Sequence, residues 1–317
     1  MNIWEELSKK GTISCLAPME GVTDICFRQV IAKAGRPDLF FTEFTNVSSY
    51  ASEKGRANAL ERLKIAPTDP PIIAQIWGKN PDHFAEITSA LKSLGFSGVD
   101  LNFGCPDKHV NKAGGGAAMI RTPDLAIKCF QNAMKHSNGL PVSIKTRLGF
   151  THIDEYKIWV PTLLREHPSA LTVHLRTRKE MSKVPAHYEL IPDIINLKNE
   201  LSPETKLLIN GDVLDHIQGE KLVHNNPGLD GYMIGRGVFQ NPYCFIDHQP
   251  TKEELLTLLD IHLDLFDKES NHTKISFEPL KHYFKIYIKD FPGASELRQK
   301  LMECHSTIEA RQILQSK

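Results

Sequence analysis

Short apolar segments alternate with longer amphipathic segments along most of this chain. Each apolar segment holds four to six residues, mostly β-branched or aliphatic, bounded by turn residues, which is typical of buried strands. The eight predicted strands are Ser14–Pro18, Leu39–Glu43, Ile72–Ile76, Gly98–Asn102, Val142–Arg147, Leu171–His174, Leu207–Asn210 and Gly231–Ile234.

Apolar residues at helical spacing fill most of the intervals between these strands. The predicted helices are Thr23–Ala34, Pro81–Leu94, Pro123–His136, Asp154–Arg165, Glu189–Glu200 and Leu214–His224, whereas the interval 44–70 is longer and less regular. Strands that alternate with helices favour a parallel sheet covered on both faces. Eight such units in about 240 residues predict an α/β fold, a closed (β/α)₈ barrel rather than an open doubly wound sheet.

The alternation stops after Pro242. From about residue 250 to residue 317 leucines and aromatic residues recur at helical spacing without a strand-like run, and Pro292 and Gly293 interrupt them. A chain of 317 residues exceeds the usual single domain, although an α/β barrel absorbs about 250 residues. We therefore predict a barrel domain over residues 1–247 and a small all-helical domain of two to four helices over residues 248–317.

Composition narrows the possible partners. The chain holds 38 Lys and Arg against 38 Asp and Glu, so any affinity for nucleic acid must come from a local basic patch. The six scattered cysteines form no CxxC pair, which indicates neither a zinc site nor a disulfide framework and fits a reducing cytoplasm. No apolar run approaches the roughly 20 residues of a membrane span, and the first ten residues lack a signal-peptide pattern. We expect a cytoplasmic monomer without metal or membrane partner.

Polar residues gather at or just after the carboxyl ends of the predicted strands. In a barrel these ends meet on one face, where active sites are built, and elsewhere such residues would disturb an apolar core. The residues concerned are Met19, Gln75, Asn102, Cys105, Lys145, Arg147, His174, Asn210 and Arg236.

The last two strands end in glycine-containing loops, Asn210-Gly-Asp212 and Gly235-Arg-Gly237. Loops at these two places of a barrel commonly hold a phosphate, because glycines let backbone N–H groups approach the oxyanion. Arg236 can add a charge-assisted hydrogen bond. Either glycine alone would be read as a tight turn, but both together favour a phosphate site.

Four strand-end residues are candidates for holding a planar ring. Lys145 can stabilise negative charge that develops on a bound isoalloxazine, and Gln75 offers a donor and an acceptor to its pyrimidine edge. Met19 and His174 end two further strands. The alternatives are an ion pair of Lys145 with Glu43 or Asp100 and a core role for His174.

Cys105 is the candidate reactive group. It lies beyond a strand end, between Gly104 and Pro106, in a loop with Lys108 and Lys112. An ordinary thiol with a pKa of about 8.5 is protonated at neutral pH and can act as a general acid. Basic neighbours could instead lower the pKa and favour a nucleophilic thiolate. A buried apolar role is the usual alternative for a lone cysteine.

In the tail, Lys281, Lys285 and Lys289 recur every four residues, which predicts one basic helix face. Such a face can bind RNA phosphates or can simply be solvated surface.

Taken together, these motifs resemble the tRNA-dihydrouridine synthase family. The matching blocks, in order, are Leu16-Ala-Pro-Met-Glu-Gly-Val-Thr-Asp24, Asp100-Leu-Asn-Phe-Gly-Cys-Pro106, Ser143-Ile-Lys-Thr-Arg-Leu-Gly149, Val173-His-Leu-Arg-Thr-Arg178, Asn210-Gly-Asp212 and Gly235-Arg-Gly237. They span nearly the whole barrel. The start of the chain is most similar to the bacterial subgroup that acts near position 16 of the tRNA D-loop.

The resemblance implies an FMN-dependent enzyme that uses NADPH to reduce uridine in tRNA to 5,6-dihydrouridine. The reduced flavin N5 would give hydride to C6, and Cys105 would protonate C5. FMN would be bound by Pro18, Met19, Gln75, Lys145, His174, Asn210, Gly211, Asp212, Gly235 and Arg236. The substrate would be bound by Asn102, Arg147, Arg178, Lys281 and Lys285, the last two from a tRNA-binding helical domain. The base must leave its stack, at a cost of a few kcal/mol that phosphate contacts offset.

Two departures from the family pattern concern the predicted site. Leu175 replaces a usual glycine, and the segment 178–183 lacks the aromatic residue that some members place near the uracil. Two other functions remain open on the residues alone. One is an FMN barrel that reduces a free pyrimidine or another small enone, and the other is a tRNA-binding folding chaperone with weak catalysis.

Overall fold

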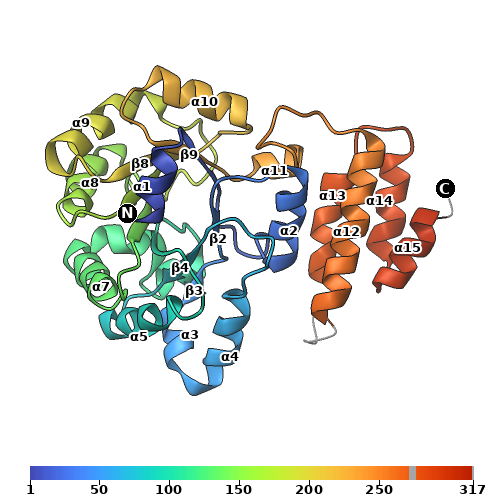
Figure 1. Ribbon diagram of the computed structural model, residues 1–317, viewed down its shortest axis with the longest axis horizontal. Coiled ribbons are helices and arrows are strands. Elements are labelled where there is room, and N and C mark those ends of the chain that lie inside the picture. Colours follow the sequence, from blue (N-terminus) through green and yellow to red (C-terminus); the bar gives the residue numbers. More distant parts are fainter. Residues whose placement is uncertain (271–275, 316–317) are drawn as a thin grey trace.

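A computed structural model describes residues 1–270 and 276–315 of the chain. Residues 271–275 and 316–317, which belong to the predicted helical domain, lie outside the described part. Figure 1 shows a barrel on one side, surrounded by helices, and a group of C-terminal helices on the other. The strands are β1 (Ile13–Leu16), β2 (Phe40–Phe41), β3 (Thr45–Asn46), β4 (Ile72–Trp77), β5 (Gly98–Phe103), β6 (Val142–Arg147), β7 (Ala170–His174), β8 (Lys206–Asn210) and β9 (Gly231–Ile234).

All strand pairs in the sheet are parallel, in the order β1-β9-β8-β7-β6-β5-β4-β2. A bridge between Cys15 and Leu39 links β1 back to the residue before β2, with the Leu16 N–H donating to the Leu39 carbonyl at 3.2 Å. The eight long-range pairings therefore form a nearly closed (β/α)₈ barrel, which confirms the predicted fold class.

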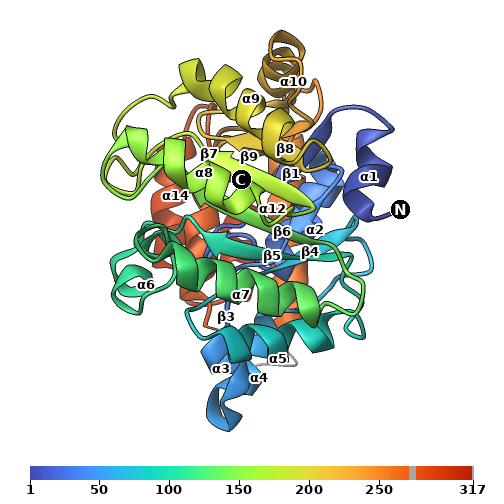
Figure 2. The ribbon, with the colours of Figure 1, turned by 90° about the vertical axis from the view of Figure 1, so that its left-hand side faces the viewer.

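Helices wrap the outside of this barrel, as the side view in Figure 2 shows. Each predicted helix is present within a few residues of its expected bounds: α2 (Ile25–Ala34), α5 (Pro81–Leu91), α7 (Pro123–Lys135), α8 (Tyr156–Leu164), α9 (Ile191–Leu201) and α10 (His216–Asn225). Local signals fix their starts. Asp24 and Asp215 cap α2 and α10 through their side chains, and proline occupies the first turn of α5 and α7.

The irregular interval after β2 contains more structure than its sequence pattern predicts. Strand β3 pairs with β4 through Thr45 and Ile76, and α3 (Val47–Ala51) and α4 (Glu53–Arg62) follow it. Arg56 on α4 donates to the Tyr50 carbonyl at 2.9 Å, which ties the two helices together. Figure 1 shows this pair projecting from the lower edge of the barrel. Shorter elements flank the barrel, namely α1 (Ile3–Ser8), α6 (Lys108–Lys112) and α11 (Gly237–Gln240).

The C-terminal part is helical and packs against α2. It comprises α12 (Lys252–Ser270), the 3₁₀ helix η4 (Glu278–Tyr283), α13 (Phe284–Tyr287), α14 (Ala294–Glu303) and α15 (Thr307–Gln315). Ring contacts join Phe27 of α2 to Tyr283 and His262. The Tyr283 hydroxyl also donates to the Val22 carbonyl at 2.7 Å. The 1–247 and 248–317 boundary stays a prediction.

The expected single basic helix face is wrong. Lys281 lies on the 3₁₀ helix η4 and Lys285 on the short helix α13, which ends before Lys289. The apolar side chains around them decide this geometry, because Leu280, Phe284 and their neighbours are almost fully buried. Spacing alone therefore does not place the three lysines on one face.

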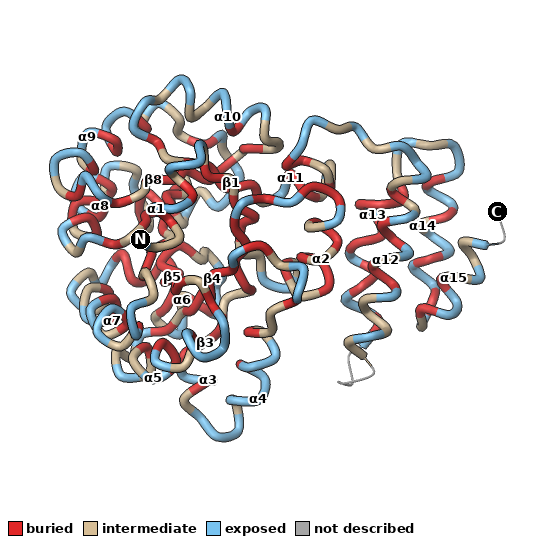
Figure 3. Tube along the Cα trace, viewed as in Figure 1, coloured by how far each residue is buried: buried red, intermediate tan, exposed pale blue. Residues whose placement is uncertain are grey.

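Buried residues concentrate in the barrel strands and in the inward faces of the helices (Figure 3). Among residues 1–270 and 276–315, no helix is long and apolar enough to cross a membrane. In the same part of the chain no group of three or more His, Cys, Asp or Glu side chains is arranged to hold a metal ion.

Candidate active site

A cavity of about 540 Å³ opens at the carboxyl ends of the strands. This volume lies within the range of ordinary ligand pockets. Thirteen predicted residues line the cavity: Pro18, Met19, Gln75, Asn102, Cys105, Lys145, Arg147, His174, Asn210, Gly211, Asp212, Gly235 and Arg236. The structure thus brings together, at one place, side chains that are up to 218 positions apart in the sequence (Pro18 and Arg236).

The backbone around Cys105 is held from both sides. The Asn102 Oδ1 accepts the N–H groups of Gly104 at 3.0 Å and Cys105 at 2.9 Å. The Cys105 carbonyl accepts the Asn111 Nδ2 at 2.8 Å and the Ala117 N–H at 3.0 Å. A Cβ at Gly116, where φ is +58°, would lie 2.8 Å from the Cys105 carbonyl oxygen. Only glycine therefore allows the backbone at residue 116 to pass this close to Cys105. The thiol is therefore fixed in position by its own loop.

A buried chain of hydrogen bonds leads from β5 to this loop. Asp100 accepts the Ser143 Oγ and the Gln75 Nε2, both at 2.7 Å. The Gln75 Oε1 then accepts the Asn102 Nδ2 at 2.9 Å. The Gln75 Nε2 must point toward Asp100, because a carboxylate accepts hydrogen bonds. The Gln75 Oε1 therefore points toward Asn102, so Asp100 determines the orientation of the carboxamide. Burial raises the pKa of Asp100 to about 6, although these hydrogen bonds and Lys145 oppose the shift.

Burial also raises the pKa of the Cys105 thiol above its ordinary value. Asp107 adds to this shift through its charge, whereas the hydrogen bond from the Asp107 backbone N–H and the charge of Arg147 oppose it. The basic residues of the loop do not bring the pKa of Cys105 below its ordinary value. The thiol is therefore protonated at neutral pH, which favours the acid over the nucleophile.

Lys145 presents a half-buried positive charge to the cavity. Its Nζ donates to the neutral Asn210 Oδ1 at 3.0 Å, and no ion pair of Lys145 is found among the described residues. Burial lowers its pKa to about 8, with a further contribution from Arg147 and opposition from Asp100. The alternative of an ion pair with Glu43 or Asp100 is thus wrong, since Asp100 is bound by Gln75 and Ser143.

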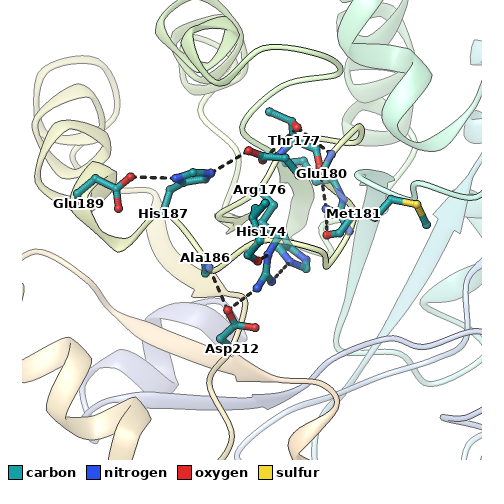
Figure 4. Close-up of polar contacts among 11 residues, drawn as sticks. His174, Arg176, Thr177, Glu180, Met181, Ala186, His187, Glu189 and Asp212 are labelled. Atoms are coloured by element: carbon teal, nitrogen blue, oxygen red, sulfur yellow. Dashed lines mark hydrogen bonds and ion pairs between the residues drawn. The ribbon is translucent and has the colours of Figure 1, made fainter.

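His174 belongs to a second polar network, drawn in Figure 4. The Arg176 Nη1 lies 3.2 Å from the His174 Nε2, and because arginine only donates, Nε2 must accept and Nδ1 must carry the proton. Burial and the neighbouring cations hold the pKa of His174 well below its usual value. His174 is therefore a neutral imidazole with an Nδ1–H donor. Arg176 also pairs with Asp212, which in turn pairs with Arg236 at 3.2 Å.

The loop after β7 is locked by its own side chains. Figure 4 shows His187 between Glu180 and Glu189, at 3.0 and 2.9 Å. Glu180 also accepts the Thr177 N–H at 2.7 Å. Arg147 joins this loop to the thiol loop, since it donates to the carbonyls of Gly104, Thr177 and Met181 at 2.8, 3.1 and 3.0 Å. Much of the Arg147 guanidinium is thus used to hold two loops together.

The loops after β8 and β9 approach the cavity closely. Gly211 has a φ of +117°, and a Cβ there would lie 3.3 Å from the His174 ring. A Cβ at Gly235 would extend toward Ala17 and Met19, at 3.6 and 3.8 Å, and so into the cavity wall. These features suit a bound phosphate.

Three predicted substrate residues do not line this cavity. Arg178 lies over the Phe150 ring at 5.3 Å, and within the described residues its buried Nε has no partner. Lys281 is only 7 % exposed and pairs with Glu278 at 2.8 Å. Lys285 is exposed, over the Phe239 ring at 5.3 Å. Their roles toward a substrate stay predictions.

The sequence patterns did not identify several residues of the site. Arg176 and Asn111 act through loops, where no periodicity marks them, although Arg176 stands two residues after His174 in a matching block. Glu20 and Phe44 line the cavity mouth, as does Ser182 in the segment that lacks an aromatic residue. Leu175 is fully buried, and its N–H donates to the Asn210 carbonyl at 3.0 Å, so its side chain serves the core.

Comparison with known proteins places these residues in a family. Residues 15–317 match the model of the dihydrouridine synthase family. The chain is 46% identical over 316 residues to the probable tRNA-dihydrouridine synthase 2 of Bacillus subtilis (strain 168), covering 99% of this chain and 95% of that protein. It is 48% identical to the probable tRNA-dihydrouridine synthase of Staphylococcus aureus (strain COL), covering 99% and 94%.

Solved structures share the fold at low sequence identity. A 2-naphthoyl-CoA reductase complex has a TM-score of 0.54 at 11% identity, covering 76% of this chain and 51% of that one. Morphinone reductase in complex with tetrahydroNAD has a TM-score of 0.51 at 12% identity, covering 73% and 84%. These likenesses support the barrel fold alone. The match to the family model over residues 15–317 and the identity to these relatives show that this chain belongs to the dihydrouridine synthase family.

Proposed function

We propose that this protein reduces uridine in tRNA to 5,6-dihydrouridine, with FMN as cofactor and NADPH as reductant. Its relatives are named as probable tRNA-dihydrouridine synthases, which supports the tRNA substrate. One observation of the structure carries the chemistry: a protonated thiol, a half-buried cation and a glycine cradle open into a single cavity.

The residues present fit FMN. The half-buried Lys145 ammonium is bound by a neutral amide and has no carboxylate partner among the described residues, so a ring that gains negative charge would supply its counter-charge. The Nδ1–H of His174 adds a donor, and Gln75 lies at the floor. Gly211, Gly235 and Arg236, supported by Asn210 and Asp212, would hold the phosphate, while Pro18 and Met19 close the side of β1. When bound, FMN would supply hydride to C6 of the uracil.

The chain itself supplies the proton and the alignment. Cys105 delivers its thiol proton to C5 of the uracil, so that C5 and C6 each gain one hydrogen and the thiolate is reprotonated from water. Asn102 holds the backbone of Cys105, and Arg147 joins this loop to the facing loop by donating to the carbonyls of Gly104 and Thr177. Within the described part of the chain, the second Asn102 Nδ2 hydrogen and the Arg147 Nη2 have no hydrogen-bond partner, and they are proposed to donate to uracil oxygens. Arg178, Lys281 and Lys285 are proposed to contact the RNA outside the cavity.

The direct test is mass spectrometry of tRNA nucleosides after incubation with the protein, FMN and NADPH. We expect one uridine to gain the mass of two hydrogen atoms. A gain on free uracil or a small enone, without any on tRNA, would favour a small-molecule reductase. Salt-sensitive tRNA binding without loss of uridine would favour a folding chaperone. A purified protein that is colourless and binds no added FMN would contradict the cofactor.

Three finer points stay predictions: action near position 16 of the D-loop, a monomeric state and a cytoplasmic location. Mapping the reduced uridine by sequencing of tRNA fragments tests the first, and light scattering in solution tests the second.

A further inference from the structure

A second cavity, of about 630 Å³, adjoins the active site on its α3–α4 side. Glu20, Phe44 and Cys105 line both cavities, so the two spaces meet at the thiol. The outer wall comes from the irregular interval after β2 and includes Asn58 of α4. Nothing in the proposed reaction uses this space.

Aromatic surface is available in this cavity. Phe44 and Trp77 are half-buried and meet edge to face, with ring centroids 6.4 Å apart and planes at 79°. Trp77 is the last residue of β4, and a Cβ at Gly115 would lie 2.7 Å from its ring. The indole is therefore fixed against the glycine-rich loop that follows Cys105. Half-buried rings of this kind offer a stacking surface for a planar group.

The charges in the cavity disfavour a phosphate. Arg62 is its cation, and it pairs with Glu20 at 2.6 Å and approaches Glu43 at 3.6 Å. Asp107 adds a second carboxylate to the lining, and its pKa is lowered by backbone N–H groups of α6, so it is ionised at neutral pH. The lining thus has a neutralised cation and an excess of carboxylate. A pyrophosphate would be repelled, whereas the amino edge of a base would find acceptors.

We propose that this second cavity binds the nucleobase of the nucleotide next to the reduced uridine. This inference rests on the proposed function. A uracil in the first cavity lies beside Cys105, and its neighbour in the strand, joined by one phosphodiester, reaches the adjoining space. Single-stranded RNA is read in this manner, by stacking on aromatic side chains and by hydrogen bonds to base edges. The base stacks on Trp77 or Phe44, and Asn58 contacts its edge.

The test combines RNA and protein changes. The reduced uridine is first mapped in wild-type reactions, and tRNAs with an abasic residue immediately before or after it are then prepared. We expect one abasic tRNA to lower kcat/KM about tenfold with the wild type, the scale of one stacking contact. Both Trp77→Leu and Asn58→Ala should lower kcat/KM on intact tRNA. Trp77→Leu should lose most of the difference between intact and abasic tRNA, and Asn58→Ala, which removes the edge contact, should lose a measurable part of it. NADPH-driven flavin reduction should not change.

Asn58 is exposed on a helix, so alanine there preserves the fold and decides the test if Trp77→Leu is unstable. Asn225→Ala at the end of α10, on the far side of the barrel in Figure 1, is the matched control and should keep the full penalty. A wild type insensitive to both abasic tRNAs, or variants that keep the penalty, would overturn the inference.

Three further outcomes distinguish which part of the account is wrong. A raised KM for NADPH in Asn58→Ala, with unchanged use of tRNA, would assign the cavity to the dinucleotide and overturn the inference. No mass gain on any tRNA with the wild type would overturn the proposed function and the inference together. A mass gain with the wild type, together with variants that lose as much kcat/KM on abasic tRNA as the wild type does, would overturn the inference alone.

Discussion

At the residue scale, the environment of Lys145 differs strongly from that of an exposed lysine. Its half-buried ammonium donates to a neutral amide, and desolvation lowers its pKa to about 8. Strand-end position alone predicted that Lys145 reaches the active-site face. Its freedom from Asp100 could not be predicted, because that depends on Gln75 and Ser143 occupying the carboxylate.

The charge of Lys145 predicts a pH dependence for flavin reduction. Below pH 8 the ammonium stabilises the negative charge that the cofactor gains, and this stabilisation is lost as the pH rises through about 8. Lys145→Met should reduce the rate about 100-fold at neutral pH and remove this transition. Anaerobic stopped-flow absorbance with NADPH, without tRNA, measures both. A rate in the wild type that does not change around pH 8 would contradict the role of Lys145.

At the scale of elements, the strands and barrel helices follow the sequence pattern closely, because apolar runs and caps define them locally. Strand β3 was missed because two residues are too few to show alternation. The outer wall of the second cavity is built by the same irregular interval, residues 44–70, so no local sequence pattern indicated this cavity. Likewise, the prediction of one basic helix face in the tail is wrong. Burial of Tyr283 and Phe284 determines how this segment lies, and the four-residue spacing of the lysines does not.

Substitutions at two glycines in and after β9 should distinguish a role in folding from a role in cofactor binding. A Cβ at Gly231 would lie 2.2 Å from the Ile13 carbonyl oxygen in the β1–β9 pair, so Gly231→Ala should lower stability by about 1–3 kcal/mol. A Cβ at Gly235 meets only ordinary contacts. Gly235→Ala should keep the wild-type Tm and weaken FMN binding, because its methyl group narrows the cradle.

Thermal unfolding of the FMN-free proteins and fluorescence titration with FMN make this comparison. Equal losses of Tm in the two variants would show that Gly235 serves the fold rather than the cradle.

At the scale of the whole molecule, long-range polar contacts join the C-terminal helices to one another and to the barrel. His262 is 1 % exposed, and its Nδ1 lies 2.8 Å from the Tyr287 hydroxyl. The bond of Tyr283 to Val22 spans 261 positions of sequence. Sequence patterns could not place the two parts relative to each other, because single long-range contacts of this kind carry no periodic signal.

Burial lowers the pKa of His262 to about 3. In the unfolded chain His262 has an ordinary pKa of about 6.5. Between about pH 3 and pH 6.5, therefore, His262 is protonated in the unfolded chain and neutral in the folded chain. Stability is fully present above about pH 6.5 and falls as the pH decreases toward 3, by about 2 kcal/mol at pH 5. His262→Gln should lose less stability than the wild type between pH 7 and pH 5.

Urea unfolding of both proteins at the two pH values measures this difference. Parallel losses would show that His262 does not contribute to the acid sensitivity.

The most direct test of the proposed chemistry concerns the Cys105 proton. Wild type, Cys105→Ala and the control Cys129→Ala, which removes a buried thiol on α7, are compared on the same tRNA with FMN and NADPH. Mass spectrometry should show the gain of two hydrogen atoms at one uridine with the wild type and the control. Cys105→Ala should show a loss of at least about 100-fold while still oxidising NADPH. Undiminished reduction of tRNA by Cys105→Ala would contradict the assignment of Cys105 as the acid.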